Sequence, residues 1–242
     1  MPVSGKRGLI LNQESTDRTA STTAGVLAVM RKRQQWSQAV ERLRDLAASR
    51  GDGPHRAAEE YGEVYRGRRG AMVFDVVISR QRKYHSVVLP RVEKWAAAGD
   101  PSLARLAHSE VQAEQFGLQR TEPVTLQTVA ANLLAFCRDH AVSEDEGCRA
   151  WADGVQGLEH APKLDPIVGG VSGIGPALFA CMRMRCGSDA LKPDLRVAGA
   201  LRKLGFDVPG DEHSILVVAR AAAAELGVSL LVLDQLLWGR GG

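Results

Sequence analysis

The sequence has no long hydrophobic run and no common metal or nucleotide motif. No uninterrupted apolar stretch approaches the ~18 residues that span a bilayer, and residues 1–20 lack the apolar core of a signal peptide. The zinc pattern HExxH and the phosphate-loop pattern GxxxxGK are both missing, and we find no internal repeat. We therefore expect a cytoplasmic protein with no membrane partner and no metal site.

Cysteines are few and scattered. Their spacing fits neither paired CxxC zinc knuckles nor an iron–sulfur loop. We expect free thiols, buried or partly buried, in a reducing compartment. The cysteines concerned are Cys137, Cys148, Cys181 and Cys186.

What is present is the composition of a soluble globular protein. The 242 residues are 45% hydrophobic and 24% charged, which excludes disorder throughout, a collagen-like chain and a disulfide-stapled mini-protein. The length corresponds to one large domain or two small ones that share an interface.

The net charge of +3 is too small to establish a polyanionic partner, so the distribution of charge matters more. Basic clusters in the first third are compatible with one face that meets phosphates, or with ordinary solvated helix faces. The clusters are Arg31–Arg33, then Arg66, Arg68 and Arg69, and finally Arg80, Arg82 and Lys83.

Apolar residues recur at helical spacing along most of the chain, which predicts an all-α fold. Only Ala71–Ile78 resembles a strand, and no partner of matching alternation lies nearby. We expect a flexible tail over residues 1–22 and a first helix that starts near Ser21 or Thr22 and runs unbroken to about Ser49. Further helices are expected at 54–66, 69–79, 87–98, 101–110, 111–116, 125–140, 144–159, 176–185, 194–204, 211–226 and 229–238.

The most informative segment is a glycine-bearing turn between two short predicted helices, one ending near Gly170 and the other beginning at Pro176. The turn reads Val171–Ser172–Gly173–Ile174–Gly175, and Asp194 follows 19 positions after its last glycine, within Pro193–Asp194–Leu195–Arg196–Val197. This arrangement resembles the helix-hairpin-helix (HhH-GPD) DNA glycosylase superfamily, of the endonuclease III type. That family has a Leu-Pro-Gly-Val-Gly-like hairpin followed by an aspartate in a Val-Asp-x-x-Val-like stretch.

The resemblance implies a division of labour between the hairpin and Asp194. Glycines let the backbone at Val171, Gly173, Ile174 and Gly175 approach a phosphate, and the N–H groups that open the next helix attract the anion, so the hairpin holds duplex DNA without reading its sequence. Asp194 would stabilise positive charge on the deoxyribose while the N-glycosidic bond breaks and would orient the attacking water. The alternative for Asp194 is a helix N-cap.

Three upstream residues match the family more weakly. Gln81, at the end of Phe74–Gln81, would fill the gap left by the extruded base, and Leu118 would wedge between bases. A surface glutamine and a core leucine are the alternatives. Tyr84 would stack on the base in its pocket, unless it belongs to the core. We assign the tryptophans to the core or to a domain interface: Trp36, Trp95, Trp151 and Trp238.

Departures from the family determine the expected chemistry. Ala177 occupies the position of the lysine that forms a Schiff base in family members that also cut the strand. We therefore expect a monofunctional glycosylase that uses water and leaves an abasic site. The iron–sulfur loop of many relatives is missing after the last helix, so no cofactor is expected. Gln119–Arg120–Thr121 replaces the usual Lys-Ala after Leu118, so the match to the wedge loop ends at Leu118.

The resemblance implies a two-lobed fold with the DNA groove between the lobes. One lobe is continuous, residues 70–186, and ends in the hairpin; the other combines residues 23–69 with 187–242. The expected function is removal, by a monomer, of a damaged, mismatched or modified base flipped out of duplex DNA. The alternative is a non-catalytic DNA-binding or damage-sensing protein that retains the hairpin. A lesser possibility is an enzyme acting on modified bases of a phage or mobile element.

Overall fold

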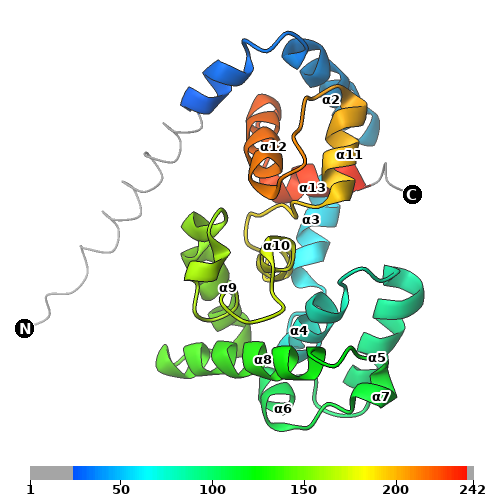
Figure 1. Ribbon diagram of the computed structural model, residues 1–242, viewed down its shortest axis with the longest axis vertical. Helices are drawn as coiled ribbons and strands as arrows, with labels where there is room; N and C mark the ends of the chain where they lie inside the picture. The colour runs from blue at the N-terminus through cyan, green and yellow to red at the C-terminus, as the bar shows by residue number, and fades with distance from the viewer. Residues whose placement is uncertain (1–23, 239–242) are drawn as a thin grey trace, which may run out of the picture.

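The structure is a computed structural model that describes residues 24–238, and within this range all regular secondary structure is helical (Figure 1). The predicted all-α class is therefore confirmed. The flexible tail predicted for residues 1–22, and the predicted helix start at Ser21 or Thr22, lie outside the described residues. Ala71–Ile78, the one stretch that resembled a strand, belongs to a helix in which every residue is buried.

Most helix boundaries agree with the predicted ranges to within a few residues. Residues 24–30 form a first helical segment. The elements that follow are α2 (Trp36–Arg50), α3 (Gly53–Glu63), α4 (Arg69–Ile78), the π-helix η1 (Tyr84–Val88), α5 (Leu89–Ala97), α6 (Leu103–His108), α7 (Ala113–Phe116), α8 (Glu122–Asp139), α9 (Glu144–Gly154), the 3-10 helices η2 (Gln156–Leu158) and η3 (Pro162–Leu164), α10 (Pro176–Arg185), α11 (Leu195–Leu204), α12 (Glu212–Leu226) and α13 (Leu230–Trp238).

The first predicted helix was wrong in one respect, because it is broken at residues 31–35. The break coincides with a run of polar side chains that has no apolar face to bury. Arg31 instead donates to Glu225 of α12 at 2.9 Å, and Arg33 forms an ion pair with Asp207. These partners hold the turn against the C-terminal helices, so that α2 starts anew at the buried Trp36.

Buried apolar residues form two main clusters. The first cluster draws on α4 to α10, and the second on α2 and α11 to α13. Figure 1 shows α2, α11, α12 and α13 gathered at one end of the molecule and α4 to α8 at the other, with α10 between them. A small third cluster connects the two through Ala58 of α3, Met184 of α10 and Leu231 of α13.

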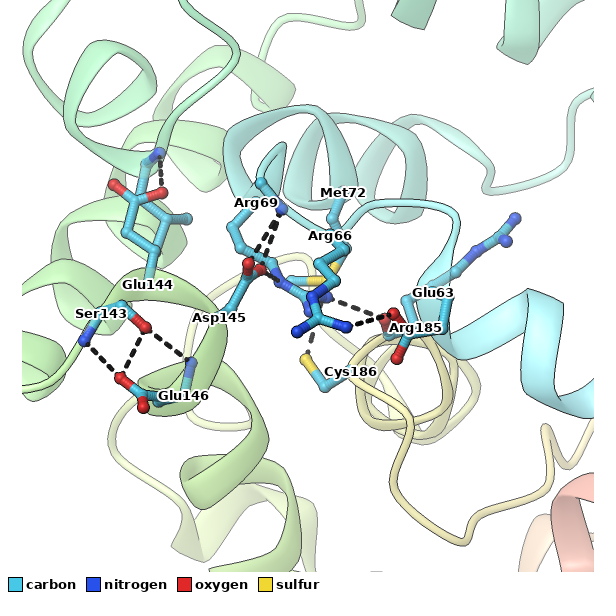
Figure 2. Close-up of polar contacts among 12 residues, drawn as sticks. Glu63, Arg66, Arg69, Met72, Ser143, Glu144, Asp145, Glu146, Arg185 and Cys186 are labelled. Atoms are coloured by element: carbon cyan, nitrogen blue, oxygen red, sulfur yellow. Dashed lines mark hydrogen bonds and ion pairs between the residues drawn. The ribbon is translucent and has the colours of Figure 1, made fainter.

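A buried arginine ties three helices of the first cluster together (Figure 2). Arg69, at the start of α4, donates to Asp145 of α9 at 2.5 Å and to the Arg185 carbonyl at the end of α10 at 3.1 Å. Asp145 also accepts from the Gly67 amide. Because a buried guanidinium is costly unless it is paired, this network fixes where α10 ends relative to α4.

All four cysteines are buried free thiols, as predicted. Among residues 24–238, no single helix has both the length and the apolar composition of a membrane span; α12 and α13 have them only as a pair, bent by 98° at the break between them.

Candidate functional site

The hairpin has one α-helical arm instead of the two that were predicted. The second arm, α10, spans Pro176–Arg185 as expected, with Pro176 in its first turn. The first arm is only the 3-10 turn η3, followed by a series of turns up to Gly173. The predicted helix ending near Gly170 was therefore wrong.

Asp165 explains why this segment forms turns. Its buried carboxylate accepts from the amides of Ile167, Val168 and Gly169 at 2.9–3.1 Å and from the Trp151 indole N–H at 3.3 Å. The side chain thus accepts the free backbone N–H groups of the first turn, as an N-cap does. Gly169 and Gly170 follow, and no helix continues beyond this turn. Asp165 therefore acts like an N-cap although no helix follows it, and the turn that it stabilises positions the hairpin.

The hairpin itself is held from both sides. Val171 and Ile174 are buried in the first cluster, and Lys163 Nζ donates to their carbonyl oxygens at 3.3 and 2.7 Å. Gly173 between them has φ +89°, and a Cβ there would lie 2.9 Å from Thr125 Oγ1. Glycine is therefore required by both backbone conformation and space.

The start of α10 presents amide groups to the hairpin side. The first intrahelical bond runs from the Phe179 N–H to the Gly175 carbonyl at 2.9 Å. The preceding first-turn amides, including those of Ala177 and Leu178, have no intrahelical acceptor, and the helix dipole places partial positive charge there. This end of α10 can bind an anion.

Asp194 is the N-cap of α11. Its Oδ1 accepts from the Arg196 and Val197 amides at 2.9 and 3.0 Å, and its Oδ2 lies 3.8 Å from Lys192 Nζ. The side chain is 27% exposed. One carboxylate oxygen therefore caps the helix, and the other lies near an ammonium group.

Two cavities meet at Asp194. A cavity of about 770 Å³, here the hairpin cavity, is lined by Gly173–Gly175, Ala177, Leu178 and the Lys192–Leu195 segment among others. A second cavity of about 640 Å³ is lined by Asp75, Tyr84, Arg185, Asp234 and Trp238 among others, and it is called the polar cavity here after its charged side chains. The linings share Ser79, Gln81, Lys192 and Asp194.

Of the three weaker candidates from the sequence, Gln81 and Tyr84 line a cavity and Leu118 does not. Gln81 is exposed, lines both cavities, and has φ +55°, a left-handed conformation that is uncommon for a residue other than glycine. Tyr84 lines the polar cavity at the start of η1, and π-helical turns recur at functional sites. Leu118 packs partly against the first cluster and is not among the residues that line either cavity.

The polar cavity contains a cluster that the sequence did not reveal. Asp75 of α4 forms a buried ion pair with Arg185 of α10 at 3.0 Å, and both contact the Tyr84 hydroxyl, at 3.3 and 2.8 Å respectively. The Arg185 guanidinium stacks 3.7 Å from the Tyr61 ring centroid. Burial raises the pKa of the Asp75 carboxyl, and Arg185 partly offsets this. One signal was available, because Asp75 interrupts an otherwise apolar run.

Trp238 corrects a further prediction. Trp36, Trp95 and Trp151 are buried as expected, but Trp238 is 48% exposed. Its ring lines the polar cavity, with the Arg196 guanidinium 5.8 Å and the His85 ring 6.4 Å from its centroid. An exposed indole at a cavity is suited to stacking on a planar ligand.

Most cations of the first two basic clusters are paired with acids. The pairs are Arg31–Glu225, Arg33–Asp207, Arg66–Glu63, Arg68–Glu93 and Arg69–Asp145. Of the three clusters, only the third contributes to the lining of the two cavities, through Arg80, Arg82 and Lys83. Arg82 is itself paired with Glu122 at 2.6 Å.

Asp234 of α13 is a second buried carboxyl of the polar cavity, and we expect its titration to make the free energy of unfolding depend on pH. Burial, together with the charge of Asp194, raises its pKa to about 7, although Lys192 acts in the opposite direction. The folded protein then keeps a proton that the unfolded chain loses near pH 4, so this group makes stability fall as pH rises from about 4 to about 7.

We therefore expect Asp234→Asn, which keeps the shape and removes the charge, to be more stable than wild type above pH 7. The gain is at most roughly 4 kcal/mol, from about 1.4 kcal/mol per pKa unit, and vanishes near pH 4. Urea unfolding at pH 4.5, 6 and 8 measures it. A stability difference that does not change with pH contradicts the assignment.

Within residues 24–238, no group of three or more His, Cys, Asp or Glu side chains is arranged to hold a metal ion. The chain matches no protein-family model, no curated protein and no solved structure.

Proposed function

We propose that this chain is a monofunctional DNA glycosylase of the helix-hairpin-helix type, which hydrolyses the N-glycosidic bond of a base flipped out of duplex DNA. One observation carries the proposal: the hairpin cavity, where an anion can bind, and the polar cavity, which suits a planar ligand, share one partly exposed carboxylate, Asp194. A flipped nucleotide needs these three features side by side, for its phosphate, its base and its sugar.

The proposed architecture has two lobes, residues 70–186 and residues 23–69 with 187–242, and it is supported by the two buried clusters. Apart from Tyr65, the first cluster lies within residues 71–186, and the second combines residues 36–46 with 191–237. Asp194 follows directly after the chain passes from the first cluster to the second. A carboxylate at this crossing would face DNA bound between the lobes.

The proposed partner is duplex DNA, bound through its backbone. The amides that open α10 and the positive end of its dipole would hold a phosphate, and Arg80 and Lys83 add charge beside the cavities. Gln81 stands exposed between the two cavities, where a side chain could occupy the space that a flipped base leaves. We propose that a monomer performs this function.

The proposed reaction uses water. Oδ1 of Asp194 is fixed by two amides, so Oδ2 keeps a constant position from which it stabilises positive charge on the sugar as the C1′–N bond breaks. The oxygen of water bonds to C1′, and the base leaves. Ala177 occupies the position of the Schiff-base lysine, which supports a hydrolytic mechanism without a cofactor.

The alternative is a DNA-binding or damage-sensing protein without catalysis. It is favoured by the capping role of Asp194, which stabilises α11 whether or not the carboxylate acts on a sugar. It is also consistent with the position of Leu118, outside the lining of both cavities.

Base release from a panel of duplexes tests the proposal. The duplexes contain uracil, a thymine mismatch, an alkylated purine or 8-oxoguanine, and alkali then cleaves any abasic site. If the strand is cleaved only when alkali follows incubation with the protein, the result supports the monofunctional enzyme. Tight binding in a gel-shift assay, with no base released from any duplex, supports the alternative.

A further inference from the structure

The apolar helix α13 carries a single carboxylate, Asp234, which lines the polar cavity together with Asp194. Only 4% of Asp234 is exposed. Its Oδ1 accepts from the Lys192 amide at 3.2 Å, and its Oδ2 is 3.3 Å from Gln235 Nε2. The hydrogen bond to Lys192 places Asp234 against the segment that carries Asp194.

Asp234 differs from the other carboxylates of this cavity in its partners. Asp75 is equally buried, but Arg185 neutralises it at 3.0 Å, and Asp194 is bound by two amides with an ammonium group nearby. Among the described residues, no side-chain nitrogen of a Lys, Arg or His lies within 4.0 Å of the Asp234 carboxyl. A buried carboxyl without a cation is most stable in its neutral form.

The charged and titratable groups around the cavity do not reverse this preference. Asp194 repels a second negative charge, and the cations act on Asp234 only from beyond ion-pair distance, with the result that its pKa stands at about 7. His85 of η1 contacts Trp238 at the end of α13. The other charged or titratable groups that line the cavity are Tyr61 of α3, Asp75 of α4, Arg82 and Lys83 after α4, Tyr84 of η1, Cys181 and Arg185 of α10, Lys192 before α11 and Arg196 of α11.

We propose, on the premise of the proposed function, that Asp234 is the acid that protonates the departing base, and that the substrates are therefore neutral bases. Asp194 then acts as the charged carboxylate and Asp234 as the protonated acid, because the surroundings of the two carboxyls differ. A cationic alkylated purine leaves as a neutral molecule without a proton, so an acid offers it no advantage.

The proton and electron balance closes within the cavity. The electron pair of the C1′–N bond passes to the base, and the Asp234 proton moves to a ring nitrogen or an exocyclic oxygen of the base. The oxygen of water bonds to C1′. The proton that water loses returns to the Asp234 carboxylate, so the site is restored after each turnover.

Single-turnover base release tests the proposal with two substrates. One duplex carries a neutral base, namely uracil, hypoxanthine or 8-oxoguanine, whichever wild type releases fastest, and the other carries 7-methylguanine. Asp234→Asn should slow release of the neutral base by about 100-fold, the usual contribution of a general acid. The wild-type rate should fall about tenfold per pH unit above pH 7, and the variant rate should not depend on pH in this range.

Asp189→Asn is the matched control. Asp189 also accepts a backbone amide of α13, from Leu231 at 3.0 Å, but it does not line the polar cavity. Its replacement should change the rate less than threefold.

Three outcomes overturn the acid role. If wild type and Asp234→Asn release the neutral base at equal rates, the acid role fails while the proposed function stands. The same holds if Asp234→Asn slows release of the neutral and the cationic base equally. A greater acceleration of 7-methylguanine release than of any neutral base by wild type, relative to the uncatalysed rate of the same duplex, also overturns it. If wild type releases no base from any duplex, the proposed function fails as well, so the two failures are distinguishable.

Discussion

Asp194→Asn is expected to lower the rate of base release about 1,000-fold while leaving DNA affinity nearly unchanged. The carboxylate interacts more strongly with the positively charged transition state than with the neutral ground state, so its charge acts on turnover and not on binding. Removing one negative charge near phosphates does not weaken the complex. Single-turnover base release and gel-shift titration measure the two quantities separately.

Asparagine is a clean replacement because of the capping geometry. Asparagine and aspartate are about equally good N-caps, so the acceptor for the Arg196 and Val197 amides remains and α11 should stay folded. Asp189→Asn again serves as the control, and its activity should match that of wild type. Equal activity of Asp194→Asn and wild type would refute the catalytic assignment.

The wild-type product should be an intact abasic strand, with no adduct trapped by borohydride. Ala177 offers no amine, but Lys192 Nζ lies 3.8 Å from Asp194 Oδ2 and lines both cavities. A trapped adduct that disappears in Lys192→Met would show that this lysine is the nucleophile and that the enzyme is bifunctional.

Local signals explain the parts of the site that the sequence could predict. Pro176 fits the first turn of a helix, and Asp194 followed by an apolar helical pattern fits an N-cap, so α10 and the start of α11 were predicted closely. Each signal operates within one helical turn. The positive φ of Gly173 is likewise a local property that a glycine in a turn predicts.

Interactions between distant segments explain what could not be predicted. The break at residues 31–35 depends on ion pairs with Glu225 and Asp207, which lie more than 170 positions later in the sequence. The pairing of Asp75 with Arg185 joins two helices whose apolar patterns contain no information about each other. Asp234 was visible as a charge in an apolar helix, but only the fold shows that it shares a cavity with Asp194.

Asp165→Ala is expected to be the most destabilising single change near the hairpin, lowering the free energy of unfolding by about 4 kcal/mol. The carboxylate satisfies three backbone amides and the Trp151 indole, and Trp151 is itself buried in the first cluster. Each buried donor left without a partner costs roughly 1–3 kcal/mol, and the losses are not fully additive.

The consequences of this change extend to the proposed DNA contact, because the turn that Asp165 holds together directly precedes the hairpin. Asp165→Asn retains one acceptor oxygen and should lose about half as much stability, whereas Asp139→Ala, an exposed acid at the end of α8, should stay within about 0.5 kcal/mol of wild type. Urea unfolding ranks the three variants. A loss below about 1 kcal/mol for Asp165→Ala would mean that water replaces the carboxylate, and the hairpin would then be held by Lys163 and the buried Val171 and Ile174 alone.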